Sequence, residues 1–205
     1  MADISPQLVR ELRDKTNAGM MDCKRALAEA GGDLVKAEDL LRAKGIASAG
    51  KKASRSAKEG IVASYIHLQG KVGVLVEVNC ETDFVAKNEN FREFVKDITL
   101  HIAAANPTCV SREQVDPAEI EREKAIYRQQ VEGKPANIVD KIVEGKVDKF
   151  YGTICLMEQP FIKNPDVSIA DLVKSKISEL GENIVIRRFT RYMVGEGVSD
   201  EPAAE

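Results

Sequence analysis

Residues Thr82, Asp83, Phe84 and Val85 place a carboxylate directly beside a large apolar ring. This combination suits binding to another protein, with the ring acting as a wedge and the acid beside it. Loops that follow a rigid element often carry such functional side chains. The alternative is that Phe84 belongs to the core, which is the more common place for a single phenylalanine. The pattern alone leaves both interpretations open.

The residues that usually bind metals do not form a recognisable set in this sequence. The four cysteines include no C-x-x-C pair, and the two histidines are distant from all of them along the chain. A zinc site is therefore not expected, and the thiols are expected to be free and buried. The residues concerned are Cys23, Cys80, Cys109, Cys155, His67 and His101.

Nucleotide-binding and hydrolytic motifs are also missing from the sequence. No G-x-x-x-x-G-K-[ST] segment occurs, and no G-x-G-x-x-G follows a predicted strand. No Ser/His/Asp set can be assembled, because the histidines fall on a predicted strand end and a helix face. We therefore predict a protein that is not an enzyme, with no catalytic residues, no cofactor and no bound metal.

The candidate binding residues lie between a predicted strand and a predicted helix. The strand, 72–78, is short, β-branched and almost uncharged, as buried strands are. It follows another strand at 61–67 and a turn at 69–71, which together predict a hairpin. The next helix has apolar residues at helical spacing, namely Phe91, Phe94, Val95, Ile98 and Ile102.

The first 45 residues predict a bundle of three short helices. Ser5 and Pro6 mark a helix start, because a capping hydroxyl precedes a proline at the first helical position. Breaks follow at 17–19 and 31–32, and Gly45 is expected to end the third helix. This pattern resembles ubiquitin-associated domains.

The rest of the chain predicts a linker, an α+β domain and a tail. Residues 46–59 are small, polar and basic, which is typical of a flexible linker. The α+β domain covers 60–194, with a helical hairpin near 117–150 and a last strand at 183–194. Its three strands predict an antiparallel sheet covered by helices. The acidic tail, 195–205, is expected to be disordered.

Two long, ungapped motifs resemble the elongation factor Ts family. One is NCETDFV at 79–85, and the other is LRDKTNAGMMDCKRAL at 12–27. Together with the pattern at 161–192, the resemblance covers nearly the whole chain. It points to the short, bacterial or organellar form of the family, which has a single core module.

The resemblance implies a guanine-nucleotide exchange factor for elongation factor Tu that acts in translation elongation. By this resemblance, Phe84 inserts between helices of the partner's nucleotide domain. Asp83, within the binding segment of Thr82 to Val85, disturbs the surroundings of the partner's Mg²⁺. Displacement of Mg²⁺ then uncovers phosphate charge, and GDP leaves.

The resemblance also implies that the N-terminal bundle docks on the same domain of the partner. The expected contacts are Leu12, Arg13, Met20 and Met21. Flexible methionine side chains suit such a groove. Of the two methionines, Met20 is expected to be the contact and Met21 to belong to the core.

One core module supplies only three strands, and an isolated sheet of this size needs cover on its apolar face. We therefore expect a homodimer around the last strand, which would give a two-plus-two complex with elongation factor Tu, GDP-bound or nucleotide-free. The alternative is a monomer whose helical hairpin covers the sheet.

Composition restricts the classes of other partner that this protein is expected to bind. A net charge of −3 argues against a general polyanion-binding protein. No apolar run approaches the roughly 20 residues of a membrane span, and no secretory signal is visible. We expect a cytoplasmic protein with no nucleic-acid partner and no membrane partner.

Two other functions stay open. The bundle is compatible with a ubiquitin-like or helix-binding dimeric adaptor. The basic segment with Lys51, Lys52, Arg55 and Lys58 is compatible with RNA binding, although no aromatic residue is interleaved for base stacking.

Overall fold

The computed structural model describes residues 4–16, 18–131 and 135–197 of the 205-residue chain. They fold as an α+β protein, as the sequence predicts. The chain forms two compact units, and each contains segments that are distant in sequence. The first is made of Met1–Ile61, Asn79–Phe94 and Ala170–Val185, and the second of Val62–Val78, Val95–Ile169 and Ile186–Glu205.

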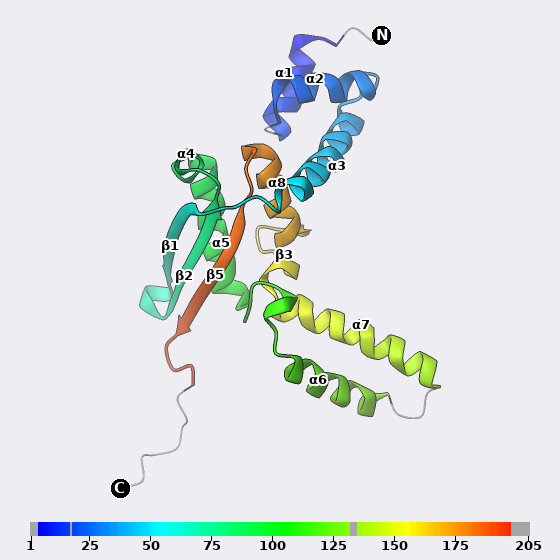
Figure 1. Cartoon of the computed structure of the whole chain (residues 1–205), viewed down its shortest axis with the longest axis vertical. Helices are drawn as coiled ribbons and strands as arrows, with labels where there is room; N and C mark the ends of the chain where they lie inside the picture. The colour runs from blue at the N-terminus through cyan, green and yellow to red at the C-terminus, as the bar shows by residue number, and fades with distance from the viewer. Residues whose placement is uncertain (1–3, 17, 132–134, 198–205) are drawn as a thin grey trace. The chain divides into compact units, whose positions relative to one another are not determined.

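Three helices open the first unit: α1 (Pro6–Thr16), α2 (Met20–Glu29) and α3 (Leu34–Lys52) (Figure 1). α1 begins where predicted, with proline at its first position and the Ser5 hydroxyl accepting the Leu8 N–H at 3.3 Å. All three helices contribute to one buried cluster, made of Val9, Leu12, Cys23, Ala26, Leu27 and Ala37.

The turn between α2 and α3 follows from its glycines. Gly31 and Gly32 have φ values of 66° and 89°, a region that glycine adopts without steric cost. Asp33 then caps α3, because its side chain accepts the N–H groups of Val35 and Lys36 at 3.0 and 3.1 Å.

The third helix is longer than predicted. α3 continues through Gly45 to Lys52, so the helix end expected at Gly45 is wrong and residues 46–52 of the predicted linker are helical. A glycine inside a helix costs only about 1 kcal/mol relative to alanine. At this position packing favours glycine, since an added Cβ would lie 2.8 Å from Ser178 Oγ.

The main sheet is antiparallel and has the order β1-β2-β5. Its strands are β1 (Glu59–His67), β2 (Val72–Cys80) and β5 (Val185–Met193), which match the three predicted strands. β1 and β2 are joined by a short 3-10 turn at Leu68–Gly70, where Gly70 has a φ of 94°. The predicted hairpin is therefore confirmed.

One face of this sheet is covered within the second unit. Val74 and Val76 of β2 are buried, and so are Val95 and Ile98 of helix α5 (Glu89–Ala105). In addition, Nε of Arg191 on β5 donates to a main-chain carbonyl of α5 at 3.4 Å. Burial of alternate strand residues is what a half-covered sheet requires.

The opposite face of the sheet carries exposed apolar side chains. Ile66 and Gly73 share this face, because a Cβ on Gly73 would lie 3.3 Å from Ile66 Cδ1. Strand alternation puts three more large apolar residues on the same side. The four exposed side chains, called the outer sheet patch below, are Val62, Ile66, Leu75 and Tyr192.

Helices α6 (Pro117–Gln130) and α7 (Ala136–Ile154) form the predicted hairpin (Figure 1). Asp116 caps α6 by accepting the Ala118 N–H at 2.8 Å. α7 runs beyond the predicted end near residue 150, and residues 132–134 between the two helices lie outside the described residues. The two helices share an apolar seam of Ile120, Val131, Val143 and Val147.

The remaining elements are short, apart from helix α8 (Ile169–Leu180), which ends at Gly181 with a φ of 79°. The one-turn helix α4 (Asp83–Ala86) and the small sheet of β3 (Pro160–Phe161) and β4 (Asn164–Ser168) were not predicted. Both are too short to show a periodic pattern. Most of the predicted tail, 198–205, lies outside the described residues.

Candidate partner-binding site

The predicted binding residues lie where β2 passes into α4 (Figure 1). Thr82 is the N-cap of α4, and its hydroxyl accepts the Val85 N–H at 3.4 Å. The buried Cys80 thiol donates to the Thr82 carbonyl at 3.1 Å. Burial, reinforced by the Glu182 carboxylate, raises the pKa of this thiol to about 11, so it keeps the proton that it donates. Residues 82–85 are called the wedge loop below.

Phe84 points away from the protein. Its exposed fraction is 81%, the highest among the large apolar side chains that the structure describes. The neighbouring Ala86 is buried, so α4 is anchored on one side while the ring lies in solvent. Phe84 is therefore not a core residue, and its contact with a partner stays a prediction.

Asp83 adds a fixed negative charge next to this ring. Its Oδ2 accepts a hydrogen bond from Lys87 Nζ at 2.6 Å, across one turn of chain. This hydrogen bond and the charge of Lys87 hold the pKa of Asp83 below its ordinary value. The wedge loop thus presents an apolar ring and an ionised carboxylate together.

Sequence reasoning missed one further residue at this site, Glu182. Its carboxylate accepts the N–H groups of Glu81 and Thr82, each at 3.0 Å, and the Thr82 hydroxyl at 2.6 Å. The two segments are 100 or more residues apart along the chain, so no local periodicity connects them. The one local signal is the position of Glu182, directly after the glycine that ends α8.

The N-terminal candidates occupy two different environments. Arg13 and Met20 are exposed on the bundle, whereas Leu12 is completely buried in its core. Leu12 therefore supports the bundle from inside in the free protein and offers no surface for a partner.

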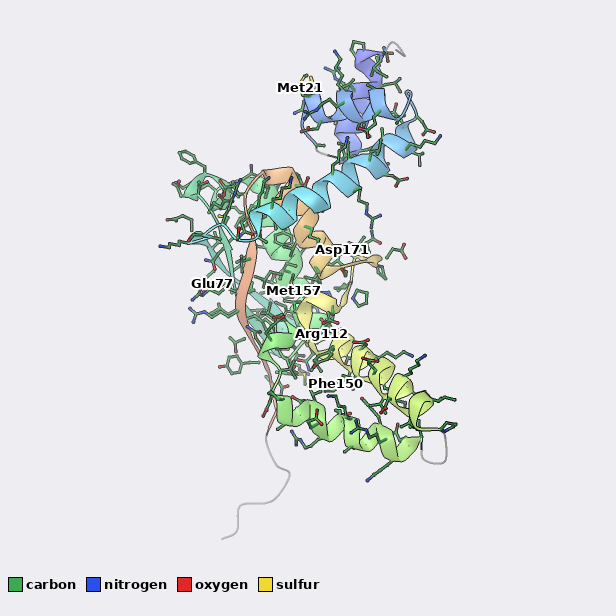
Figure 2. The ribbon with its side chains drawn as sticks, turned by 45° about the vertical axis from the view of Figure 1, so that its right-hand side comes forward. Met21, Glu77, Arg112, Phe150, Met157 and Asp171 are labelled. Atoms are coloured by element: carbon green, nitrogen blue, oxygen red, sulfur yellow. The ribbon has the colours of Figure 1, made fainter. Side chains whose placement is uncertain are left out.

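Met21 is not the core residue that the sequence suggested. Its exposed fraction is 67%, against 55% for Met20. Figure 2 shows the Met21 side chain on the outside of the helical bundle. α2 buries the face that carries Cys23 and Leu27, and Met21 is out of phase with that face. Both methionines are consequently on the surface.

A groove of about 510 Å³ brings these methionines next to α1. Met20, Met21 and Lys24 line it from α2, and Pro6 and Arg10 line it from α1. An apolar groove with basic side chains beside it is suited to a helix or loop of another protein.

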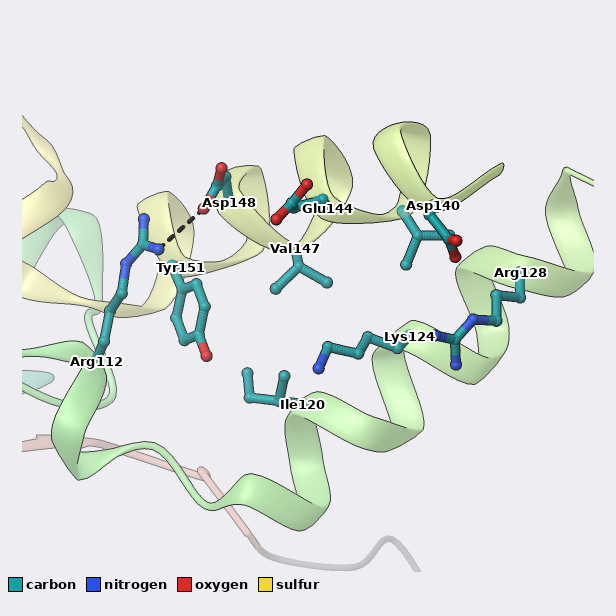
Figure 3. A pocket seen from close by; sticks show the side chains of 10 residues that line it. Arg112, Ile120, Lys124, Arg128, Asp140, Glu144, Val147, Asp148 and Tyr151 are labelled. Atoms are coloured by element: carbon teal, nitrogen blue, oxygen red, sulfur yellow. Dashed lines mark hydrogen bonds and ion pairs between the residues drawn. The ribbon is translucent and has the colours of Figure 1, made fainter. Parts of the chain in front are cut away.

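A second groove of about 400 Å³ lies between α6 and α7 (Figure 3). Lys124 and Arg128 line it from α6, whereas Asp140 and Glu144 line it from α7. Because charges of both signs are present, this groove shows no preference for an anionic or a cationic ligand.

The described part of the chain holds neither a metal-binding cluster nor a membrane-spanning helix. Within 4–16, 18–131 and 135–197, no group of three or more His, Cys, Asp or Glu side chains is placed to hold a metal ion. Over that part of the chain, no helix is both long enough and apolar enough to cross a membrane.

Known proteins resemble this chain along almost its entire length. The family model described as "Elongation factor TS" matches residues 48–196. The chain is 61% identical over 198 residues to elongation factor Ts of Alkaliphilus oremlandii (strain OhILAs), which covers 96% of this chain and 91% of that protein. It is 56% identical over 210 residues to elongation factor Ts of Desulforamulus reducens, covering 100% of this chain and 97% of that protein. The chain therefore belongs to the elongation factor Ts family.

Proposed function

We propose that this protein is a guanine-nucleotide exchange factor for elongation factor Tu, acting in translation elongation in the cytoplasm. Family membership supports the proposal, and one structural observation carries it: an 81% exposed Phe84 beside an ionised Asp83 on an anchored loop. In this role the protein binds and releases a partner and makes or breaks no covalent bond, so it is not an enzyme.

The physical basis of exchange is linkage. A protein that stabilises a conformation of its partner with weak affinity for GDP and Mg²⁺ speeds the release of both. Phe84 supplies a large ring that gains free energy when it inserts between partner elements. Asp83 brings negative charge toward the Mg²⁺ surroundings. Once Mg²⁺ leaves, the phosphate charge of GDP is no longer neutralised and the nucleotide dissociates.

The decisive experiment follows fluorescent GDP on elongation factor Tu. The protein should accelerate release at catalytic ratios, and excess unlabelled GDP should weaken the complex of the two proteins, since the two ligands oppose each other. Capture from bacterial lysate tests the alternatives. Recovery of a ubiquitin-like protein or RNA in place of elongation factor Tu would favour the adaptor or the RNA-binding function.

We also propose that the helical bundle of α1, α2 and α3 makes a second contact with elongation factor Tu, through Arg13, Met20 and Met21. Removing residues 1–53 cuts directly after the C-cap of α3, at Ala53. The remainder is expected to fold and to bind elongation factor Tu about tenfold more weakly or worse, which corresponds to about 1.4 kcal/mol of lost contact. Full exchange activity in the truncated protein would exclude the bundle from the mechanism.

We propose a homodimer in which the outer sheet patch packs against a second copy, giving a two-plus-two complex with elongation factor Tu. Four large apolar side chains on one sheet face support it. Arg188 on the same face donates from Nε to Glu77 Oε2 at 2.7 Å and so keeps an acceptor in an interface, although Arg187 shares this carboxylate at 3.6 Å.

Light scattering at micromolar concentration tests the dimer, with and without reductant. A dimer mass is expected in both, and Leu75→Lys should give monomers. Val35→Lys, at an exposed apolar position of α3, is the matched control and should leave the dimer intact. A monomer mass for the unmodified protein would disprove the dimer, and dissociation by reductant alone would disprove apolar packing as its cause.

A further inference from the structure

The wedge loop is attached to a distant segment through a single carboxylate. Glu182 lies in the turn between α8 and β5, just after Gly181 with its φ of 79°. One of its oxygens, Oε2, accepts the main-chain N–H groups of Glu81 and Thr82, and the other, Oε1, accepts the Thr82 hydroxyl. Hydrogen bonds to an ionised acceptor are about twice as strong as neutral ones.

The attachment is reciprocal. Oε1 of Glu81 accepts the Asn183 N–H at 2.6 Å, so each segment donates a main-chain N–H to an acid of the other. Asn183 in turn donates from Nδ2 to the carbonyls of Ala53 and Arg55, at 3.3 and 2.8 Å. The turn that carries Glu182 is therefore itself held in place.

The same hydrogen bonds orient α4. The Thr82 hydroxyl donates to Glu182 and accepts the Val85 N–H, so the carboxylate fixes the cap that starts the helix. A single turn of helix is not stable alone in water, because nucleation is unfavourable. α4 depends on this support, and the direction of Phe84 depends on α4.

We infer that Glu182 is the positioning residue of the wedge loop, and this inference rests on the proposed exchange function. Glu182 does not touch the partner. It holds Thr82 so that Phe84 is already in its binding orientation before the encounter, which lowers the ordering cost of binding.

The test compares Glu182→Ala with Glu182→Gln in release of fluorescent GDP from elongation factor Tu. Glu182→Ala is expected to slow release about tenfold or more, since small misplacements of a positioned group have effects of this size. Glu182→Gln should recover most of the activity. Its oxygen can accept both N–H groups and its amide can donate to the Thr82 hydroxyl.

The matched control is Glu179→Ala. Glu179 is an acid in the last turn of α8, three residues before Glu182, and its carboxylate binds Asn90 Nδ2 at 3.1 Å and Lys176 Nζ at 2.7 Å instead of the wedge loop. This variant should exchange normally. A loss equal to that of Glu182→Ala would show a general effect on α8 and overturn the inference.

A double variant separates positioning from general stability. If Glu182 acts only through the ring, Glu182→Ala should slow release far less in a Phe84→Ala background than in the unmodified protein. Equal losses in both backgrounds would overturn the inference.

Amide hydrogen exchange in the free protein distinguishes the positioning role of Glu182 from the proposed exchange function. Glu182→Ala should lose protection at the N–H groups of Glu81 and Thr82, and Glu182→Gln should retain it. If elongation factor Tu releases GDP at the normal rate with Phe84→Ala, the proposed role of the ring is wrong. If the N–H groups of Glu81 and Thr82 stay protected in Glu182→Ala, the role of Glu182 is overturned by that result alone.

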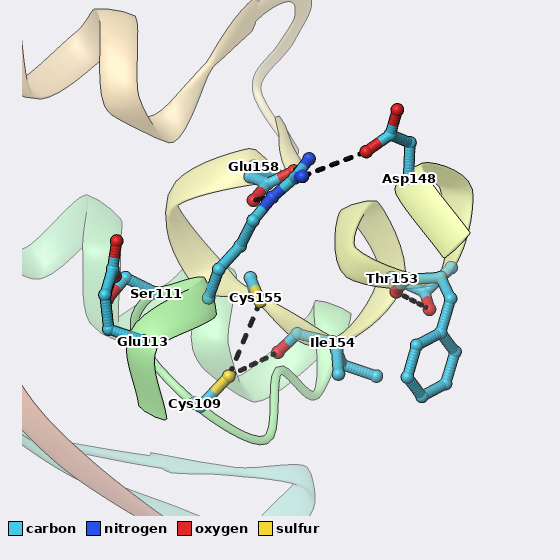
Figure 4. Close-up of polar contacts among 10 residues, drawn as sticks. Cys109, Ser111, Glu113, Asp148, Thr153, Ile154, Cys155 and Glu158 are labelled. Carbon is cyan, nitrogen blue, oxygen red and sulfur yellow. Dashed lines mark hydrogen bonds and ion pairs between the residues drawn. The ribbon is translucent and has the colours of Figure 1, made fainter. Parts of the chain in front are cut away.

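A different observation concerns two cysteines at the base of the helical hairpin. Cys109 and Cys155 face each other as partners in an isolated parallel bridge, and their sulfur atoms are 3.6 Å apart (Figure 4). Bridged chains lie about 4.8 Å apart, which is within the Cα separation that a disulfide spans. The N–H of Leu156 donates to the Cys109 carbonyl at 2.9 Å and holds the two segments together.

The two thiols differ in access. Cys109 is partly exposed, whereas Cys155 is completely buried. Burial and then the hydrogen bond with Cys109 raise the pKa of the Cys155 thiol to about 12. A dissolved oxidant therefore reaches Cys109 first.

We further propose that Cys109 and Cys155 are a site of oxidative modification, forming an intramolecular disulfide with hydrogen peroxide as the oxidant. Peroxide oxidises the Cys109 thiol to a sulfenic acid and releases one water. The Cys155 sulfur then attacks the Cys109 sulfur, and the hydroxyl leaves with the Cys155 proton as a second water. The bond would tie the segment after α5 to the end of α7.

Peptide mass mapping after peroxide treatment tests this site. A Cys109–Cys155 peptide lighter by two hydrogen atoms is expected, and reductant should reverse it. Cys109→Ser should abolish it, and Cys23 and Cys80, both buried, should stay reduced as internal controls. Sulfinic acid at Cys109 with a free Cys155 thiol, or a disulfide between two chains, would overturn the proposal.

Discussion

Phe84 and Phe91 are close neighbours in sequence and have opposite environments. The exposed fraction is 81% for Phe84 in the wedge loop and 0% for Phe91 in α5. α5 is long enough to present one continuous apolar face to the core, whereas α4 is a single turn that buries only Ala86. An exposed apolar ring therefore indicates a binding site when, as at Phe84, the backbone that carries it is firmly anchored.

The largest expected effect is on the buried member of this pair. Phe91→Ala should lower the free energy of unfolding by about 3–5 kcal/mol, because it removes buried apolar contacts and leaves a cavity. Chemical denaturation monitored by circular dichroism measures this loss. A change below about 1 kcal/mol would mean that α5 is not packed as described.

Phe84→Ala should show the reverse pattern. Its free energy of unfolding should change by less than about 0.5 kcal/mol, as for an ordinary surface substitution. GDP release from elongation factor Tu should slow about 30-fold, because a central interface residue contributes about 2 kcal/mol or more.

Phe84→Leu, which keeps an apolar side chain, is the control and should retain part of the activity. If Phe84→Ala melts early while its folded fraction exchanges normally, the contrast between the two phenylalanines fails.

A smaller effect should appear at His101, which lies in the buried face of α5. The Ile162 N–H donates to Nδ1 at 3.3 Å, so the proton of the neutral ring is on Nε2, which donates to Gln159 Oε1 at 3.0 Å. Burial lowers the pKa of His101 from 6.5. Below pH 6.5 the unfolded chain binds a proton that the folded chain rejects, so stability should fall as the pH drops toward the folded pKa.

The free energy of unfolding, measured between pH 5 and pH 8, tests this pH dependence, with the His101→Gln variant as the reference protein. The exposed His67 is present in both proteins, so its contribution cancels in the difference. The stability difference between the proteins should be constant above the ordinary pKa of 6.5 and should change below it. A difference that is constant over the whole range would contradict the buried, neutral His101.

The smallest effect is expected at the surface pair of Asp83 and Lys87. Lys87→Ala should raise the pKa of Asp83 toward its ordinary value, as carbon NMR of the carboxyl group can measure. Because the pKa of Asp83 is lowered in the folded protein, the ionised carboxylate stabilises the fold at pH values above its ordinary pKa. This stabilisation is lost as the pH falls through the folded pKa. Since both side chains are exposed, the melting temperature at neutral pH should hardly change. An unchanged Asp83 pKa would show that the pair does not form in solution.

Several helices and strands could be predicted because their information is local. The Ser5–Pro6 start, the glycines at 31–32 and the valines of β2 each act within a few residues, and the structure has α1, the turn before α3 and β2 at those places. The wedge loop was located for the same reason, since a change of period marks the join of strand and helix.

The sequence-based expectations at Gly45, Leu12 and Met21 differ from the structure for a common reason, which is packing. Gly45 has the local character of a helix end, but α3 continues through it, and the close approach of Ser178 leaves room only for glycine there. Leu12 and Met21 both belong to a binding motif in sequence, but the helix faces bury the first and expose the second. Which face of a short helix is buried depends on its neighbours as well as on its own residues.

The sequence by itself determined that an acid and a phenylalanine stand at a strand-to-helix join, and that the chain resembles elongation factor Ts. Only the tertiary structure decided that Phe84 is exposed and that Glu182 holds Thr82 in place. Glu182 and Thr82 are 100 residues apart, and the contact forms only when the turn after α8 meets the end of β2. Contacts of this kind arise from the folding of the whole chain, because no local propensity specifies which distant groups will satisfy a free N–H.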